Sequence, residues 1–223
     1  MSHEWPMVIS FREKEMARLP RLSVPGIPQH IIQRGNNRQV CFGSDQDFSA
    51  YVHWIKESSE KHLIAIHAWV FMTNHVHLLV TPKTETGVSQ LMQYLGRYYV
   101  QYFNREYRRS CTLWEGRYKS CLVQEAQYLL QCYRYIELNP VRANMVSHPA
   151  EYTWSSYAIN AQGKESSLQT PHTLYLALGK TAKQRQTAYQ GLFTAHLDKE
   201  TETNIRKATK TEWCWAVSTS KTR

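Results

Sequence analysis

The segment Asn74-His75-Val76-His77-Leu78 contains the sharpest chemical feature of the chain, a pair of histidines separated by one residue. Side chains on a β-strand alternate between its two faces, so His75 and His77 are predicted to point the same way, with Val76 directed into the core. Two imidazoles on one strand face form a ready pair of metal ligands. Two surface histidines on a half-exposed strand are the alternative interpretation.

A second chemical feature lies on the helix predicted over residues 126–138. Its core face is formed at helical spacing by Leu129, Cys132, Tyr133 and Ile136. A neighbouring polar stripe is rich in tyrosine and amide side chains and contains Tyr128, Gln131, Tyr135 and Asn139. Because Tyr135 and Asn139 are one turn apart, they could bring a nucleophile and an oxygen-donating metal ligand to the same point. The alternative is an ordinary amphipathic helix with a partly buried tyrosine.

Basic and aromatic residues are interleaved between positions 97 and 119. The basic ones considered as phosphate contacts are Arg97, Arg105, Arg108, Arg109, Arg117 and Lys119. Arginines for phosphates and aromatic rings for unstacked bases are the composition of a groove that binds single strands or hairpins. Tyr118 is expected to stack on a base, whereas other aromatic residues here belong to the core by their periodicity. Arg34 and Arg38, on either side of a Gly-Asn-Asn turn, are further candidates for phosphate contacts.

The order of predicted elements indicates a fold. They are a strand at 30–32, a helix capped by Asp45 or Asp47, strands over 64–71 and 75–81, a helix over 88–108, a strand over 116–124 and the helix over 126–138, closed by Asn139-Pro140. This order predicts a ferredoxin-like α+β sandwich, with four antiparallel strands and two helices on one face. The helix with Tyr135 follows the last strand.

Three regions are expected along the chain. Residues 1–27 form an arm, residues 28–158 form the main domain, and residues 159–223 form a small helical extension of open role, entered through a polar linker over 161–170. No Gly-rich phosphate loop, GxSxG elbow, HExxH motif or catalytic acidic pair is present. Cys121 and Cys132 lack a local catalytic partner and are predicted to be core residues.

Composition narrows the class of protein. Of 223 residues, 42% are hydrophobic and 20% are charged, which excludes general disorder. The formal charge of +9 favours a polyanionic partner. No apolar run is long enough to span a membrane, and five cysteines without a CxxC pair indicate a reducing cytoplasm.

Four blocks in fixed order carry a resemblance to a known family. They are residues 25–38 (PGIPQHIIQRGNNR), 74–79 (NHVHLL), 113–120 (LWEGRYKS) and 133–143 (YRYIELNPVRA). Together they resemble the REP-associated tyrosine transposases, which are single-tyrosine HUH nucleases related to insertion-sequence transposases. The resemblance extends over about residues 16–158 and does not reach the C-terminal extension.

The resemblance implies a catalytic domain that cleaves single-stranded DNA beside palindromic repeat hairpins and rejoins it. His75 and His77 match the metal-binding pair of the family, Tyr135 matches its nucleophile, and Asn139 stands where relatives carry an amide that completes the site. The implied cofactor is Mg²⁺ or Mn²⁺, and the implied intermediate is a 5′-phosphotyrosine. The implied protein is cytoplasmic and nucleoid-associated, as a monomer or homodimer.

Two other functions remain open from the residues alone. A non-catalytic protein that binds nucleic-acid hairpins would use the same basic groove without needing the two histidines, Tyr135 and Asn139 together. The activity of a metal-dependent RNA nuclease that uses metal-bound water would not require Tyr135.

Overall fold

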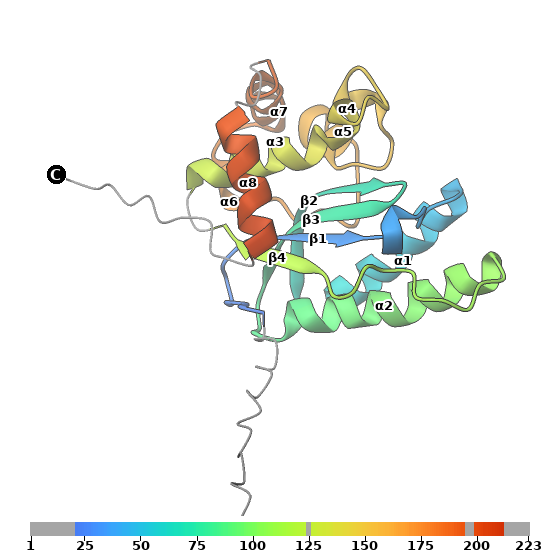
Figure 1. Cartoon of the computed structure of the whole chain (residues 1–223). Coiled ribbons are helices and arrows are strands. Elements are labelled where there is room, and N and C mark those ends of the chain that lie inside the picture. The colour runs from blue at the N-terminus through green and yellow to red at the C-terminus, as the bar shows by residue number, and fades with distance from the viewer. Residues whose placement is uncertain (1–20, 124–125, 195–198, 212–223) are drawn as a thin grey trace, which may run out of the picture.

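The computed structural model describes residues 21–123, 126–194 and 199–211. Its centre is a four-stranded sheet made of β1 (Gln29–Arg34), β2 (Ile64–Met72), β3 (His75–Pro82) and β4 (Lys119–Leu122). The strands lie in the order β2-β3-β1-β4, and neighbouring strands are antiparallel. Helices lie on both faces of this sheet (Figure 1). The arrangement confirms the predicted α+β sandwich with a four-stranded antiparallel sheet.

The register of the central strands sets the direction of the two histidines. β3 pairs with β1 so that Ile32 lies opposite His77 and Arg34 lies opposite His75. Directly opposite residues of an antiparallel pair share a face of the sheet, so these four side chains lie on one face. Val76 is buried in the core on the other face, as the strand alternation predicts. The turn between β2 and β3 contains only two residues, which confirms the predicted hairpin.

One face of the sheet is covered by α1 (Asp45–Lys61) and α2 (Gly87–Glu106). The prediction that Asp45 or Asp47 caps α1 was wrong, because the cap is Ser44, whose backbone is extended. Asp47 has another role in the first turn of the helix. Its buried carboxylate accepts hydrogen bonds from the backbone N–H of Ser44 and from the hydroxyls of Tyr102 and Tyr107, which joins the start of α1 to the end of α2.

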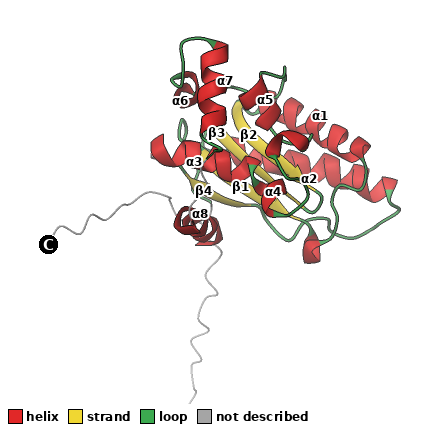
Figure 2. Ribbon diagram, turned by 90° about the horizontal axis from the view of Figure 1, so that it is seen from above, coloured by secondary structure: helices red, strands yellow, loops and turns green. Residues whose placement is uncertain are grey.

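The helix with Tyr135 is α3 (Ala126–Glu137), and it packs on the opposite face of the sheet (Figure 2). α3 ends at Glu137, just before the Asn139-Pro140 pair that was predicted to close it, so that prediction is confirmed. A second short helix, α4 (Asn139–Arg142), begins there, because proline is tolerated in the first turn of a helix. The consequence is that Arg142 returns toward α3 and Tyr135.

The described helices after residue 156 pack on the same core as α3. After the 3-10 helix η2 (Pro149–Glu151) come α5 (Tyr157–Gln162), α6 (Thr173–Leu176), α7 (Ala182–Gly191) and α8 (Lys199–Thr211). The boundary expected between residues 158 and 159 therefore falls inside α5. The expected polar linker is also tied to the sheet, because Thr170 N–H donates to the carbonyl of Ile66 at 2.7 Å and Leu168 is buried.

The arm expected over residues 1–27 lies mostly outside the described residues. Within the described part, the backbone N–H of Gly26 donates to the carbonyl of Pro82 at 2.8 Å, so this segment follows the end of β3. Arg21 lies over the ring of Tyr118, at 4.3 Å from its centroid. β4 is shorter than expected because the chain turns at Gly116, which has a φ of +66°. No helix within the described ranges has the length and hydropathy of a membrane span.

Candidate active site

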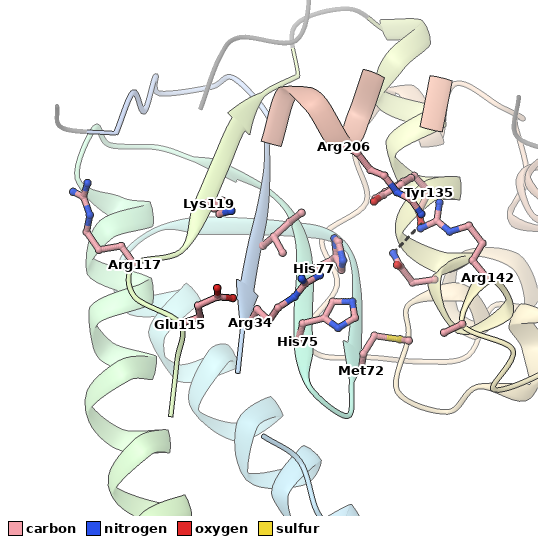
Figure 3. Close-up of a pocket in the computed structure, with 13 residues that line it drawn as sticks. Arg34, Met72, His75, His77, Glu115, Arg117, Lys119, Tyr135, Arg142 and Arg206 are labelled. Carbon is pink, nitrogen blue, oxygen red and sulfur yellow. Dashed lines mark hydrogen bonds between the residues drawn. The ribbon is translucent and has the colours of Figure 1, made fainter. Parts of the chain in front are cut away.

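A pocket of about 360 Å³ opens on the face of the sheet that carries the two histidines (Figure 3). Its walls come from β1, the end of β2, β3, the segment around β4, α3, α4 and α8. The lining residues are Ile32, Arg34, Met72, His75, His77, Glu115, Arg117, Lys119, Tyr135, Asn139, Arg142, Ala143 and Arg206. Seven of the residues selected from the sequence are therefore brought together here: Arg34, His75, His77, Arg117, Lys119, Tyr135 and Asn139.

The histidine pair lies on the floor of this pocket, with ring centroids 5.1 Å apart. Each ring is held through its Nδ1 atom. The Nδ1 of His75 is 2.6 Å from the side-chain oxygen of Asn74, and the Nδ1 of His77 is 2.9 Å from Nε2 of His30. A ring that is held through Nδ1 has Nε2 left for a ligand.

Both imidazoles are neutral at physiological pH. Burial lowers the pKa of His75 to about 4, with a smaller contribution from the positive charges of Arg34 and Arg142. Burial also lowers the pKa of His77 well below its usual value, and the neighbouring histidines and arginines act in the same direction. A neutral imidazole keeps the lone pair that metal coordination needs.

Tyr135 projects from α3 against the histidines, although only 4% of its surface is exposed. Its ring meets the ring of His77 edge-on, with centroids 5.8 Å apart. The guanidinium of Arg142 lies over the same ring at 3.9 Å from the centroid, and its Nη2 donates to the carbonyl of Tyr135 at 3.0 Å. The tyrosine ring is therefore clamped between a strand histidine and an arginine of α4.

Asn139 sits one turn after Tyr135, and its amide nitrogen is directed back into α3. That nitrogen donates to the carbonyls of Tyr135 and Ile136, at 3.0 and 3.2 Å. The hydrogen bonds orient the carboxamide, and they leave its oxygen as the atom that can serve a ligand in the pocket.

The donor set of the pocket fits a divalent cation. No three His, Cys, Asp or Glu side chains form a metal-binding group within the described residues, so two histidines need a donor of another type. The carboxamide oxygen of Asn139 is such a donor and lines the same pocket. Two imidazole nitrogens and one amide oxygen would leave coordination positions for phosphate oxygens. The two imidazoles suit a transition metal such as Mn²⁺ better than Mg²⁺, which prefers oxygen ligands.

The basic residues selected from the sequence divide into two groups. Arg34, Arg117 and Lys119 line the pocket. Four others do not line it: Arg97 and Arg105 are exposed on α2, which covers the opposite face of the sheet, and Arg108 and Arg109 follow that helix. Arg38 lies beside the pocket, where its carbonyl accepts from the side-chain nitrogen of Asn74 at 3.3 Å.

Tyr118 does not present a free face for a base. Its side chain is 9% exposed, it packs with the core on the α1 and α2 side, and Arg21 covers its ring. The expectation of base stacking by Tyr118 is therefore wrong, because its side chain, one residue before β4, packs into the core on the face opposite the pocket.

Comparison with known proteins identifies the family. The family model described as "Transposase IS200 like" matches residues 23–139, which is more than half of the chain. The chain belongs to the IS200-like transposase family. It is therefore an enzyme of the tyrosine transposase class, a single-strand DNA endonuclease. The matched segment contains all four of His75, His77, Tyr135 and Asn139.

One solved structure supports the fold of this IS200-like transposase, and a second is similar in sequence alone. A REP-associated tyrosine transposase bound to a REP hairpin is 16% identical, with a TM-score of 0.54, and the match covers 70% of this chain and 93% of that chain. A candidate transposase from Deinococcus radiodurans is 21% identical, with a TM-score of 0.38, and the match covers 54% of this chain and 96% of that one. No curated protein sequence matched significantly.

Three residues that line the transposase pocket or lie directly behind it were not predicted from the sequence. Arg142 lies seven residues after Tyr135 within a block that was recognised, but the proline at position 140 suggested that the helical path had ended. His30 precedes the conspicuous Arg-Gly-Asn-Asn-Arg turn and has no motif of its own. Arg206 belongs to α8, and only tertiary packing brings it to the pocket; nothing in its local sequence indicates that position.

Proposed function

We propose that this IS200-like transposase cleaves single-stranded DNA beside a palindromic hairpin by forming a covalent bond between Tyr135 and a 5′-phosphate. The observation that carries the proposal is the contact between the Tyr135 ring and His77, 5.8 Å between centroids, inside a pocket lined by basic side chains. A nucleophile candidate and a pair of metal-ligand candidates from distant parts of the chain meet at one point.

The basic side chains supply the phosphate contacts. Arg34, Arg117 and Lys119 border one side of the pocket and Arg206 borders the other. Their charges attract the DNA backbone and hold it across the opening. His75, His77 and Asn139 would hold Mg²⁺ or Mn²⁺, which as a Lewis acid withdraws charge from the scissile phosphate.

Tyr135 then acts on the bound phosphodiester. Its phenolic oxygen forms a bond to phosphorus and the bond from phosphorus to the 3′-oxygen breaks. The phenolic proton passes to solvent, and the leaving 3′-oxygen takes up a proton from solvent. The products are a 5′-phosphotyrosine and a DNA end with a free 3′-hydroxyl. Rejoining reverses these steps with another 3′-hydroxyl. The fixed cation of Arg142 over the ring holds the phenol in place and opposes the negative charge that develops on it.

Two observations support a class of substrate: the net charge of the chain and the DNA bound to a similar solved protein. A formal charge of +9 suits a polyanion, and the REP-associated relative was solved with a REP hairpin. We therefore propose hairpin DNA of repeat type as the substrate, reached in the cytoplasm where the nucleoid lies. Both a monomer and a homodimer are compatible with a pocket built within one chain.

The experiment uses a labelled single-stranded hairpin DNA with Mg²⁺ or Mn²⁺, and it scores a protein–DNA adduct that survives boiling in detergent. Tyr135→Phe should abolish the adduct and preserve hairpin affinity, because only one oxygen is removed. Tyr133→Phe is the matched control, since Tyr133 lies on the same helix and is fully buried in the core; this variant should keep the adduct.

Each other result contradicts the proposal in its own way. An adduct with Tyr135→Phe would mean that another side chain is the nucleophile. Cleavage without any adduct would indicate a nuclease that uses metal-bound water. Hairpin binding without cleavage by the wild type would indicate a non-catalytic binding protein.

A further inference from the structure

His30 is a fully buried histidine on β1 that contacts the candidate metal site from behind. Its Nε2 atom lies 2.9 Å from Nδ1 of His77. The two rings are stacked, with centroids 5.1 Å apart and planes inclined by 17°. The ring of His30 also meets the ring of Tyr135 edge-on at 5.8 Å. His30 therefore contacts two of the site residues without lining the pocket.

The strand register explains how a residue so far away in sequence reaches His77. Ile32 lies directly opposite His77 in the β1–β3 pair, and His30 is two positions along the same strand. Residues two positions apart share a face, so His30 is the diagonal neighbour of His77. Leu79, the direct partner of His30, belongs to the core cluster packed around α3, and this packing restricts the ring of His30.

Only one proton can lie between the two facing nitrogens. If His77 donates it from Nδ1, the Nε2 of His77 keeps a lone pair. If His30 donates it from Nε2, the proton of neutral His77 must be on its own Nε2, which then cannot bind a metal ion. Asn74 makes the corresponding choice for His75, because its side-chain oxygen can only accept. His30 faces Nδ1 of His77 as Asn74 faces Nδ1 of His75.

We propose that His30 is a positioning residue that accepts a hydrogen bond from Nδ1 of His77 and so presets the Nε2 lone pair of His77 before a metal ion arrives. The inference rests on the proposed function in one respect, the role of His77 as a metal ligand. Hydrogen-bond partners behind ligating histidines fix the tautomer and ring orientation, and their loss typically weakens metal binding by about 10–100-fold.

The first test measures the tautomer directly in the metal-free, full-length protein. Long-range ¹H–¹⁵N correlation spectra of the histidine rings distinguish a proton on Nδ1 from a proton on Nε2. We expect His77 to be protonated on Nδ1, with His75 as an internal reference that Asn74 holds in the same form. A proton on Nε2 of His77 would overturn the proposal.

The second test compares two substitutions of similar length. His30→Gln can place an acceptor oxygen where Nε2 lies, whereas His30→Met removes the acceptor and retains an apolar side chain. His30→Met should move the His77 proton toward Nε2 and weaken Mn²⁺ binding, followed by electron paramagnetic resonance, by about 10–100-fold. His30→Gln should retain the Nδ1 proton and bind Mn²⁺ within about threefold of the wild type.

The outcomes separate this inference from the proposed function. Equal Mn²⁺ affinity in the wild type and both variants would refute the positioning role. If His30→Met does not fold, the spectrum and affinity of His30→Gln against the wild type still decide the matter. Failure of the wild type to bind Mn²⁺ would contradict the metal role of His77, while the tautomer in the metal-free protein would still report on the His30 hydrogen bond.

Discussion

Glu137 ties the helix that carries Tyr135 to the C-terminal helices, and it makes stability depend on pH. Its carboxyl group is fully buried. One oxygen accepts hydrogen bonds from the Ser156 hydroxyl and the Asn160 amide, and the other accepts from the Tyr189 hydroxyl at 2.7 Å. Replacing Glu137 by Gln keeps the shape and most hydrogen-bonding capacity of the side chain and removes the ionisable group.

Burial raises the pKa of Glu137 from 4.5 to about 7, although its three donors act in the opposite direction. Between these two values the folded protein holds a proton that the unfolded chain has lost. Stability from this group is therefore complete below pH 4.5 and is lost as the pH rises through 7. Integrating the difference in bound protons gives a loss of about 2–3 kcal/mol between pH 5 and pH 8.

Urea unfolding of the wild type and Glu137→Gln at several pH values measures this effect. The buried histidines contribute a slope of opposite sign, because burial lowers the pKa of His67, for example, to about 4. That slope is common to both proteins and cancels in their difference. From pH 5 to pH 8, the free energy of unfolding of the wild type should fall by about 2–3 kcal/mol relative to the variant. A difference that stays constant with pH would refute the reasoning.

Two further predictions concern the pocket. His77→Ala should lower the rate of DNA cleavage at least about 100-fold. Hairpin affinity should stay within about threefold, because it comes mainly from contacts between basic side chains and phosphates. An equal loss of hairpin affinity in a gel-shift assay would instead make His77 part of the DNA groove. The double substitution of Arg117 and Lys119 by Gln should flatten the slope of log K against log salt by roughly 1–2 units. The same change at Arg97 and Arg105, which removes equal charge from α2, should alter the slope less, and the reverse order would locate the DNA on the α2 face.

The periodicity of a single strand and of a single helix was sufficient to predict the two residue pairs of the candidate site. The alternation of a β-strand predicts that His75 and His77 share a face, whatever the strand pairs with. The turn of a helix predicts that Tyr135 and Asn139 lie on one side, whatever the helix covers. Both predictions need only the type of the local element, and for that reason they hold without knowledge of the fold. The order of the elements was enough to indicate the ferredoxin-like arrangement.

Periodicity does not tell which face of a sheet a helix covers. Arg97 and Arg117 looked equivalent as basic residues in one stretch of sequence, yet α2 packs on the face without the pocket and only Arg117 lines the pocket. Tyr135 was expected in a polar stripe, but His77 of β3 and Arg142 cover its ring, so the ring is buried. Burial of this kind depends on which surfaces meet.

The sequence by itself therefore determined the residue types of the site, the direction of each side chain within its own element, and the charge that selects a polyanion. Tertiary structure alone decided that His30 stands behind His77, that Arg142 lies over Tyr135 and that Arg206 closes the pocket from α8. The physical reason is distance along the chain. His30 and His77 are 47 positions apart, and Arg142 and Tyr135 are 7 positions apart in two different helices. Strand register and helix packing bring such residues together, and both are set by burial of the whole core.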